Sequence, residues 1–256
     1  MLSFGLLAAA CGSGSASTLP SVSSSSRSAT VSATSSREPS SSSSSVEPTV
    51  EPTTEPSPAP ELPAGLPASY DEDAAARDVP PEALAPPGVD VTDAIVAATS
   101  SGESIVVMWT VPSDDPFRTA TGWAAWRRFP DPPTWRPVLG RAHAPEDGVL
   151  GVAALAADVT GDGSEDAVLF EATGGSGACG NYLVADLADG VVVFSRSLCD
   201  GRVDPSSDPV GLTLTRSVFL EGDPHCCPSK TKTSVLTYAG ARSWDVASSE
   251  VVRNAP

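Results

Sequence analysis

The distribution of apolar and polar residues divides the chain near Pro67. Up to that point, beyond a short apolar start, the chain consists largely of Ser, Thr, Pro, Ala and Glu, and large apolar side chains are rare. After it, short apolar runs alternate with clusters of Gly, Pro, Asp and Ser. Roughly 170 to 190 residues in this second part can bury a core, which is the usual size of one domain.

The apolar runs predict β-strands, because they are short, rich in β-branched and aromatic residues, and bounded by turn residues. Ala188, Asp189 and Gly190 join two of them in a hairpin. The segment VTDAIVAATSS predicts a short helix instead, with Asp90 or Thr92 as its N-cap. The predicted strands cover residues 104–111, 122–129, 134–142, 148–158, 166–173, 181–187, 191–198, 211–220, 232–240 and 241–248.

This succession of short strands leaves little room for helix. We therefore expect an all-β fold, an antiparallel sandwich or barrel-like β domain with at most one short helix, preceded by a disordered stalk. The tryptophans favour packing within or against the sheets over a ligand platform of aromatic rings. They are Trp109, Trp123, Trp126, Trp135 and Trp244.

The chain starts with an apolar run, MLSFGLLAAA, that ends in small residues directly before Cys11. This layout is typical of a secretory signal, and the run is too short to span a bilayer. It resembles a bacterial lipobox, which implies that Cys11 is acylated, carries palmitate and becomes the first residue of the mature protein. An ordinary signal peptide with an incidental cysteine is the alternative. We expect an exported protein, lipid-anchored on the outer face of the cell membrane.

The segment after Cys11 has nothing to offset the entropy cost of ordering, so we expect a disordered Ser/Thr/Pro/Glu-rich stalk. Its Glu-Pro and Thr-Pro units favour an extended polyproline II chain. The stalk either carries the domain into the cell wall or is a plain linker. We divide the chain into a signal peptide (1–10), the stalk (11–67), a transitional segment with the predicted helix (68–100) and a disulfide-stapled β domain (101–256).

The charge of the chain excludes some partners. With 32 acidic and 15 basic residues, the formal net charge is −17, so the protein repels phosphate backbones and anionic lipid surfaces as a whole. We therefore expect no nucleic-acid binding. The expected partners are the membrane, through the lipid anchor, and a cell-wall or envelope ligand.

The segment DVTGDGSED, residues 158–166, repeats oxygen-bearing residues at alternate positions between two predicted strands. A calcium ion prefers such oxygen ligands around a sharp turn, here at Gly163. An EF-hand is excluded, because its bidentate glutamate would stand where Leu169 is. The predicted ligands are Asp158, Thr160, Asp162, Asp166 and the backbone carbonyl of Ser164.

The same loop resembles the strand-flanked calcium loop of FG-GAP and VCBS repeat proteins, which implies a structural Ca²⁺ at a β-hairpin. The motif occurs once in the chain, and Thr160 replaces a stronger ligand. The alternative is a polar turn whose acidic side chains face water.

Three segments together resemble the LppP/LprE family of actinobacterial lipoproteins. They are ADVTGDGSEDAVL, ACGNYLV and EGDPHCCPSKTKTSVLTYAG. The Asp-Pro-His-Cys-Cys-Pro-Ser signature is the most specific part, and the resemblance covers only the C-terminal part of the chain. It implies a location in the envelope and brings no established activity.

Four of the five cysteines lie in the expected β domain, and an even set in an exported domain predicts disulfides. Cys226 and Cys227 are adjacent, and a bridge between neighbours is strained, so we expect each of them to bond to one of Cys179 and Cys199. The alternative is a local bridge from Cys179 to Cys199 across a hairpin with a three-residue turn. Either pattern staples the domain, at about 2 to 4 kcal/mol per bridge.

Catalytic signals are weak. His225 beside two cysteines suggests zinc, but an oxidising compartment disfavours free thiolates. His143 is isolated, and Ser176 in GGSGA lacks the final glycine of a nucleophile elbow. We therefore expect no catalysis, and rank a binding or interaction module first, a purely structural envelope protein second and a hydrolase third.

Overall fold

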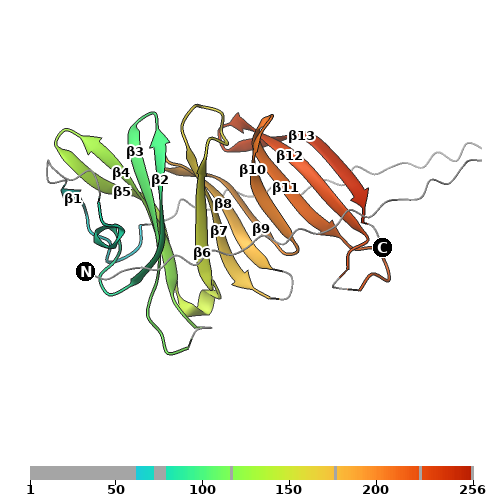
Figure 1. The fold of residues 1–256 in the computed structure, drawn as a ribbon, viewed down its shortest axis with the longest axis horizontal. Coiled ribbons are helices and arrows are strands. Elements are labelled where there is room, and N and C mark those ends of the chain that lie inside the picture. The colour runs from blue at the N-terminus through green and yellow to red at the C-terminus, as the bar shows by residue number, and fades with distance from the viewer. Residues whose placement is uncertain (1–61, 72–78, 116–117, 176–177, 225–226, 255–256) are drawn as a thin grey trace, which may run out of the picture. The chain divides into compact units, whose positions relative to one another are not determined.

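The computed structural model describes residues 62–71, 79–115, 118–175, 178–224 and 227–254 (Figure 1). Contacts between Cα atoms divide the chain into two units, Met1–Thr53 and Thr54–Pro256, and every described residue belongs to the second. The predictions for the signal peptide, for Cys11 and for the stalk up to residue 61 lie outside the described residues. So do Ser176, His225 and Cys226.

The described part is an all-β domain of antiparallel strands, as the sequence predicts. Its strands form three sheets that follow one another in chain order, coloured green, yellow to orange, and red in Figure 1. Sheet A has the order β1 (Tyr70–Asp71), β5 (Pro133–His143), β4 (Thr121–Pro130), β3 (Gly102–Thr110) and β2 (Asp90–Thr99). Sheet B is the meander β6 (Gly151–Ala157), β7 (Asp166–Gly174), β8 (Cys179–Asp186) and β9 (Val191–Leu198). Sheet C is the meander β10 (Gly201–Ser207), β11 (Val210–Val218), β12 (Lys230–Gly240) and β13 (Ser243–Arg253).

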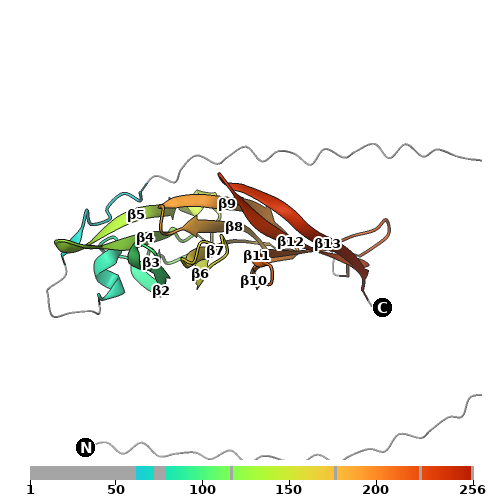
Figure 2. The same cartoon turned by 90° about the horizontal axis from the view of Figure 1, so that it is seen from above.

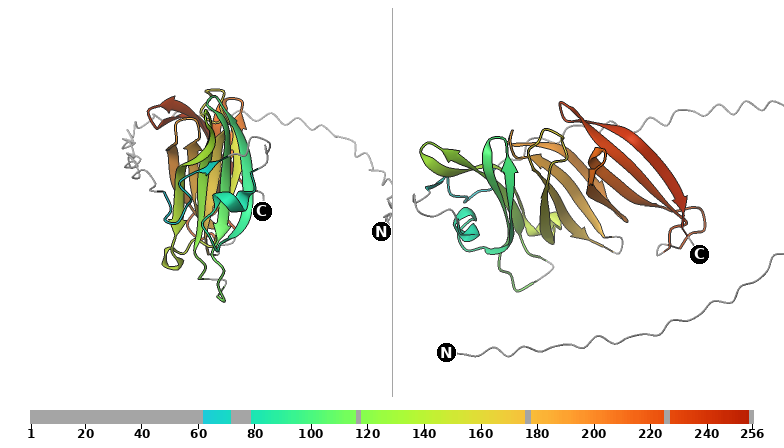
Figure 3. Two further views of the ribbon diagram at one scale, coloured as in Figure 1. Left: turned by 90° about the vertical axis from the view of Figure 1, so that its left-hand side faces the viewer. Right: turned by 45° about the horizontal axis from the view of Figure 1, so that its top comes forward.

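Three buried clusters pack these sheets together. One face of sheet A packs on the segment before β2, around Leu84 and Trp126. The other face packs on sheet B, where Trp123 meets Leu169 in the same cluster. The second face of sheet B packs on sheet C. Sheet B is therefore covered on both faces, and Figures 2 and 3 give further views of the three sheets.

The predicted helix at VTDAIVAATSS is wrong, because these residues form β2. This strand pairs with β3 along its length, and its β-branched residues, such as Val91 and Ile95, suit a pleated sheet. Within the described ranges, helix is confined to two short 3₁₀ turns, η1 (Pro81–Leu84) and η2 (Pro145–Asp147). None of the helical turns described is long and apolar enough to cross a membrane.

The remaining strand predictions agree with the structure apart from their ends. Besides β2, two strands were not predicted. One is β1, which has only two residues, and the other is β10, whose sequence GRVDPSS contains a proline and few apolar residues. The tryptophans pack in or against the sheets, as expected. Four of them are at most 3% exposed, and Trp244 is half-buried and donates from Nε1 to the carbonyl oxygen of Val193 (2.9 Å).

One disulfide joins Cys179 of β8 to Cys199, just after β9. The expected bridges from these two residues to Cys226 and Cys227 are therefore wrong, and the local alternative is correct. The turn between β8 and β9 has four residues, and a β-bulge at Val193 then shifts the strand register by one. This shift brings the two bridged Cα atoms to 4.0 Å from each other, which a four-residue turn alone would not do.

Candidate functional site

The acidic loop of residues 158–166 connects β6 to β7 and is folded by its own carboxylates. Asp158 accepts hydrogen bonds from the backbone N–H groups of Gly161 (2.7 Å) and Gly163 (3.0 Å). Asp162 accepts one from the N–H of Ser164 (2.7 Å). Both glycines have positive φ, 77° and 84°, a conformation that other residues rarely adopt. The sharp turn predicted at Gly163 is therefore present.

Asp166 is the buried carboxylate of this loop, only 1% exposed. Its Oδ2 accepts hydrogen bonds from the N–H groups of Val159 and Thr160 (3.0 Å each) and from the Thr160 hydroxyl (3.1 Å). Burial raises the pKa of Asp166 to about 6, although these hydrogen bonds oppose the rise; the charge of Asp186 adds to it. Oδ1 is buried and has no hydrogen-bond partner among the described residues.

Asp186, at the end of β8, belongs to the same electrostatic neighbourhood. Burial raises its pKa, the N–H of Asp189 opposes the rise, and the charges of Asp189 and Asp162 add to it. Carboxylates that raise one another's pKa favour a nearby cation. However, within the described ranges no three His, Cys, Asp or Glu side chains come close enough together to hold a metal ion.

The fit of the predicted calcium ligands is therefore partial. Oδ1 of Asp166 offers an unused ligand atom, whereas the Thr160 hydroxyl points its hydrogen at Oδ2 of the same carboxylate. The oxygens of Asp158 are already acceptors for backbone N–H groups. Calcium at this loop stays a prediction.

The acidic loop also connects the three sheets. Glu165 accepts a hydrogen bond at Oε2 from the N–H of Ala98 in β2 (2.7 Å) and returns one from its own N–H to the Ala98 carbonyl (2.8 Å). On its other side, the loop lies against sheet C, since a Cβ placed on Gly161 would be 3.7 Å from the Val210 side chain. The loop thus supports the packing of the sheets whether or not it binds a metal.

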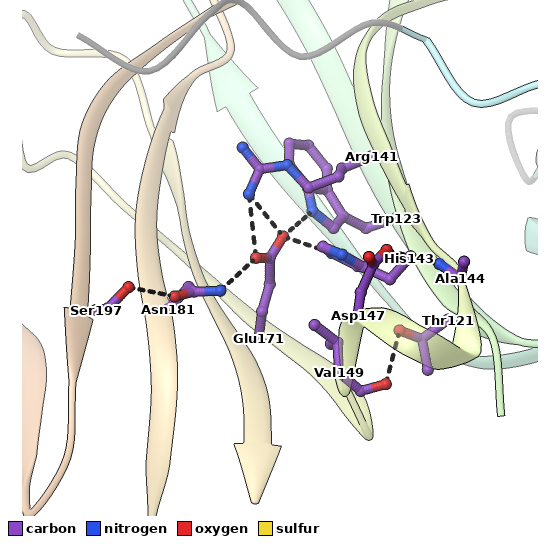
Figure 4. A network of polar contacts seen from close by, with 10 residues as sticks. All are labelled: Thr121, Trp123, Arg141, His143, Ala144, Asp147, Val149, Glu171, Asn181 and Ser197. Atoms are coloured by element: carbon purple, nitrogen blue, oxygen red, sulfur yellow. Dashed lines mark hydrogen bonds and ion pairs between the residues drawn. The ribbon is translucent and has the colours of Figure 1, made fainter. Parts of the chain in front are cut away.

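A second polar site, which the sequence analysis did not find, centres on Glu171 of β7 (Figure 4). Its carboxylate is fully buried between sheets A and B. Oε1 accepts a hydrogen bond from Nε1 of Trp123 (3.0 Å) and lies 2.9 Å from Nε2 of His143. Oε2 accepts hydrogen bonds from Nη1 of Arg141 (3.1 Å) and Nδ2 of Asn181 (3.4 Å). We call these five residues the Glu171 network.

The partners of Glu171 decide its ionisation. Burial alone would raise its pKa, but the hydrogen bond from His143, the charge of Arg141 and the hydrogen bond from Trp123 together outweigh burial and lower the pKa. The carboxylate is held ionised with its acceptor positions in use. It therefore suits a structural link between sheets A and B, which we call the latch, better than a general base. A general base needs a free lone pair and a pKa near the operating pH.

The signal for this network in the sequence is a break in strand alternation. Leu169 and Glu171 are two positions apart in β7 and share the face that packs on sheet A. Arg141 and His143 follow Leu139 at the same spacing in β5. Charged residues that continue a core face predict a buried ion pair, but the sequence does not say which strands face each other.

The surroundings of His143 offer little for catalysis. Thr121 lies opposite His143 across β4 and β5, but its hydroxyl donates to the carbonyl oxygen of Val149 (3.4 Å). A hollow of about 120 Å³ lies elsewhere, against sheet B, and is lined mainly by apolar side chains, among them Phe170 and Val203. Small-molecule sites usually measure about 300 Å³ or more.

Comparisons with protein-family models, with curated proteins and with solved structures find no match for this chain. The resemblances to LppP/LprE lipoproteins and to FG-GAP and VCBS loops therefore rest on the quoted motifs alone. The function has to be inferred from the geometry of the chain itself.

Proposed function

We propose that this chain is a cell-envelope lipoprotein, anchored through Cys11, whose β domain is a binding or interaction module outside the cytoplasmic membrane and does not catalyse a reaction. The apolar start, the cysteine after it and the polar stalk support export and anchoring. The bridge between Cys179 and Cys199 supports an oxidising compartment.

The observation that carries the binding role is the open last strand of sheet C. Among the described strands, β13 pairs with β12 alone, and ten of its eleven residues are exposed. Val246, Val251 and Val252 project from it with 57%, 52% and 50% of their surface exposed. A long uncovered strand invites unwanted association, so a protein that keeps one often uses it to bind a partner.

Two alternatives compete with this proposal. Among the described residues a hydrolase would need His143 as its base, but Nε2 of this histidine lies 2.9 Å from Glu171. The hydroxyl of Thr121, which lies opposite this histidine, donates to the carbonyl oxygen of Val149. A purely structural envelope protein would need no uncovered strand. We include a structural Ca²⁺ at the acidic loop in the proposal, supported by the unpartnered Oδ1 of Asp166 among the described residues.

Anchoring is tested by producing the full chain, with its own signal, in a Gram-positive host supplied with a clickable palmitate analogue. We expect the protein in the membrane fraction, labelled and open to protease on intact cells, and a Cys11→Ala variant that is unlabelled. Recovery of the unmodified protein from the cytosol would refute the proposal.

Binding is tested separately from anchoring with the Cys11→Ala chain, which has no thiol to acylate at that position. The purified chain is mixed with isolated cell walls freed of lipid, and the amount that sediments is compared with that of heat-denatured and cooled protein. We expect saturable sedimentation of the folded chain only. If the folded chain stays in the supernatant, binding to the cell wall is refuted.

A further inference from the structure

One face of sheet C carries cations and no carboxylate from its own strands. Residues directly opposite in neighbouring antiparallel strands share a face. Arg216 lies opposite Lys232, and Lys230 lies opposite Arg253. Lys230 and Lys232 are two positions apart in β12, so their side chains point to the same side of the sheet. Arg216 and Arg253 point to that side too, because each lies directly opposite one of these lysines. We call this side the basic face.

The acidic residues of the same strands lie on the other side, together with Arg202, which forms an ion pair with Asp204 (2.8 Å). Asp204 pairs with Thr213, Asp245 with Thr237, and Glu250 with Thr233, and these threonines alternate with the residues of the basic face. The four strands contain no further Asp or Glu. The basic face is thus free of carboxylates from its own sheet, although the chain as a whole has a formal net charge of −17.

The basic face continues a surface that is partly covered. Leu212 and Leu214 of β11 and Leu236 of β12 occupy its other end and pack against sheet B. The cations follow these leucines along the strands. Val251, which lies directly opposite Lys232, is 52% exposed. Figure 1 shows this end of sheet C reaching past sheet B. The cations therefore border an apolar junction, where Arg216, Lys230 and Lys232 are half-buried and Arg253 is exposed.

None of the four cations forms an ion pair within the described part of the protein. Within those residues, the ion pairs involve Arg141, His143 and Arg202, and none involves the basic face. The facing side of sheet B adds a further cation, Arg196, which lies opposite Tyr182. Like charges directly opposite in a sheet are destabilising, so this arrangement is costly unless an anion binds.

We propose that the basic face binds a linear, phosphate-bearing polymer of the cell envelope; this inference rests on the proposed function and names its ligand. The cations form two pairs, Arg216 with Lys232 and Lys230 with Arg253, about 6.7 Å apart along the strands. Two successive pairs suit a chain with one negative charge per repeat. Arginine offers a planar fork for phosphate and lysine a compact charge.

A polymer fits this face better than an anionic bilayer does. A bilayer would meet a broad area of an acidic protein, and the net charge would repel it. A thin chain can approach the basic face alone, because at physiological salt charges farther away than about 8 Å are largely screened.

The test compares two variants with equal loss of charge in the Cys11→Ala chain. Lys230→Gln/Lys232→Gln removes two of the four positive charges of the basic face. Arg118→Gln/Arg242→Gln removes two exposed cations outside the basic face, one in the loop before β4 and one in the turn between β12 and β13. Binding of poly(glycerol phosphate) is measured by calorimetry over a series of salt concentrations, and binding to phosphatidylglycerol vesicles, which share the same phosphate chemistry, is measured in parallel.

We expect the lysine variant to bind the polymer at least about tenfold more weakly at low salt. Its log–log salt dependence should be shallower by about 0.7 per lost contact, so about 1.4 for two. The arginine variant should bind like the parent. Its melting temperature should equal that of the parent, whereas the lysine variant should melt at the same or a higher temperature because opposed like charges are removed.

Equal polymer binding by the two variants, or no binding by the parent, would overturn the inference. Vesicle binding that depends on the two lysines, without polymer binding, would also overturn it and would identify a membrane surface instead. If the parent and the lysine variant sediment equally with cell walls, the inference fails while the proposed function stands. If neither sediments, the proposed function fails as well.

Discussion

The Glu171 network makes a quantitative prediction for Glu171→Gln, a change that keeps the side-chain shape and removes the charge. One carboxylate oxygen becomes an NH₂ group, which must face two of the former donors. Arg141 is 25% exposed and can be rehydrated, whereas Trp123 is fully buried, so the NH₂ group should turn toward Arg141. A hydrogen bond to a charged group contributes about 1.5–3 kcal/mol, and a buried unpaired donor costs about 1–3 kcal/mol. We expect the unfolding free energy to fall by about 2–4 kcal/mol.

The assay is urea unfolding at neutral pH, followed by tryptophan fluorescence and circular dichroism. The matched control is Glu103→Gln, because Glu103 is an exposed residue of β3 and its loss should change the free energy by less than about 0.5 kcal/mol. The latch interpretation would be refuted if Glu171→Gln were as stable as this control.

The same pair of proteins tests the ionisation of Glu171. Its pKa in the folded protein lies below the ordinary 4.5, so the carboxylate contributes its full stability above pH 4.5. That contribution is lost as the pH falls from 4.5 through the folded pKa. The stability difference between wild type and Glu171→Gln should therefore shrink in acid, and a difference that grows would contradict an ionised latch.

Four further predictions concern other parts of the domain. Replacing Cys179 and Cys199 together by Ser opens a loop with a sequence separation of 20, and should lower the unfolding free energy by about 3 kcal/mol in urea titrations. If the acidic loop binds calcium, a chelator should lower the melting temperature of wild type but not of Asp166→Asn, and an unchanged wild type would leave the loop a polar turn. Without metal, the unfolding free energy should fall as the pH rises from 3.8 to about 6, because burial lets folded Asp166 keep its proton to higher pH than the unfolded chain does; Asp166→Asn should remove this slope. Gly180→Ala should lower the unfolding free energy by about 1–3 kcal/mol, because its Cβ would lie 2.6 Å from the carbonyl oxygen of residue 171, whereas Gly151→Ala meets nothing within 4 Å and should be neutral.

Much of the fold could be predicted from the sequence because strand formation has a local signature. Apolar residues at alternate positions, β-branched residues and bounding turn residues identified all but three of the strands. The error at β2 has a local cause as well. Ala-rich VTDAIVAATSS is compatible with helix in isolation, and pairing with β3 over its length decides for strand.

The acidic loop shows the same limit of prediction from local sequence, here at a candidate site. Its glycine turn and its acidic residues could be read directly, since they lie within nine consecutive positions. Two other features depend on the packing of the three sheets. The carboxylate of Asp166 is buried against Val159 and Thr160, and Glu165 forms a hydrogen bond with β2. Whether a motif of oxygen ligands is free to hold a cation is therefore decided by its surroundings.

The sequence by itself determined the all-β class, the positions of most strands and the turn of the acidic loop, because each is specified by residues close together in the chain. Only the tertiary structure decided the disulfide partner of Cys179, the Glu171 network and the gathering of four cations on one face of sheet C. A single bulged residue, Val193, sets the first of these, and strands from different sheets or distant positions create the other two. Alternation along a strand tells which residues share a face, but which faces meet is a property of long-range contacts.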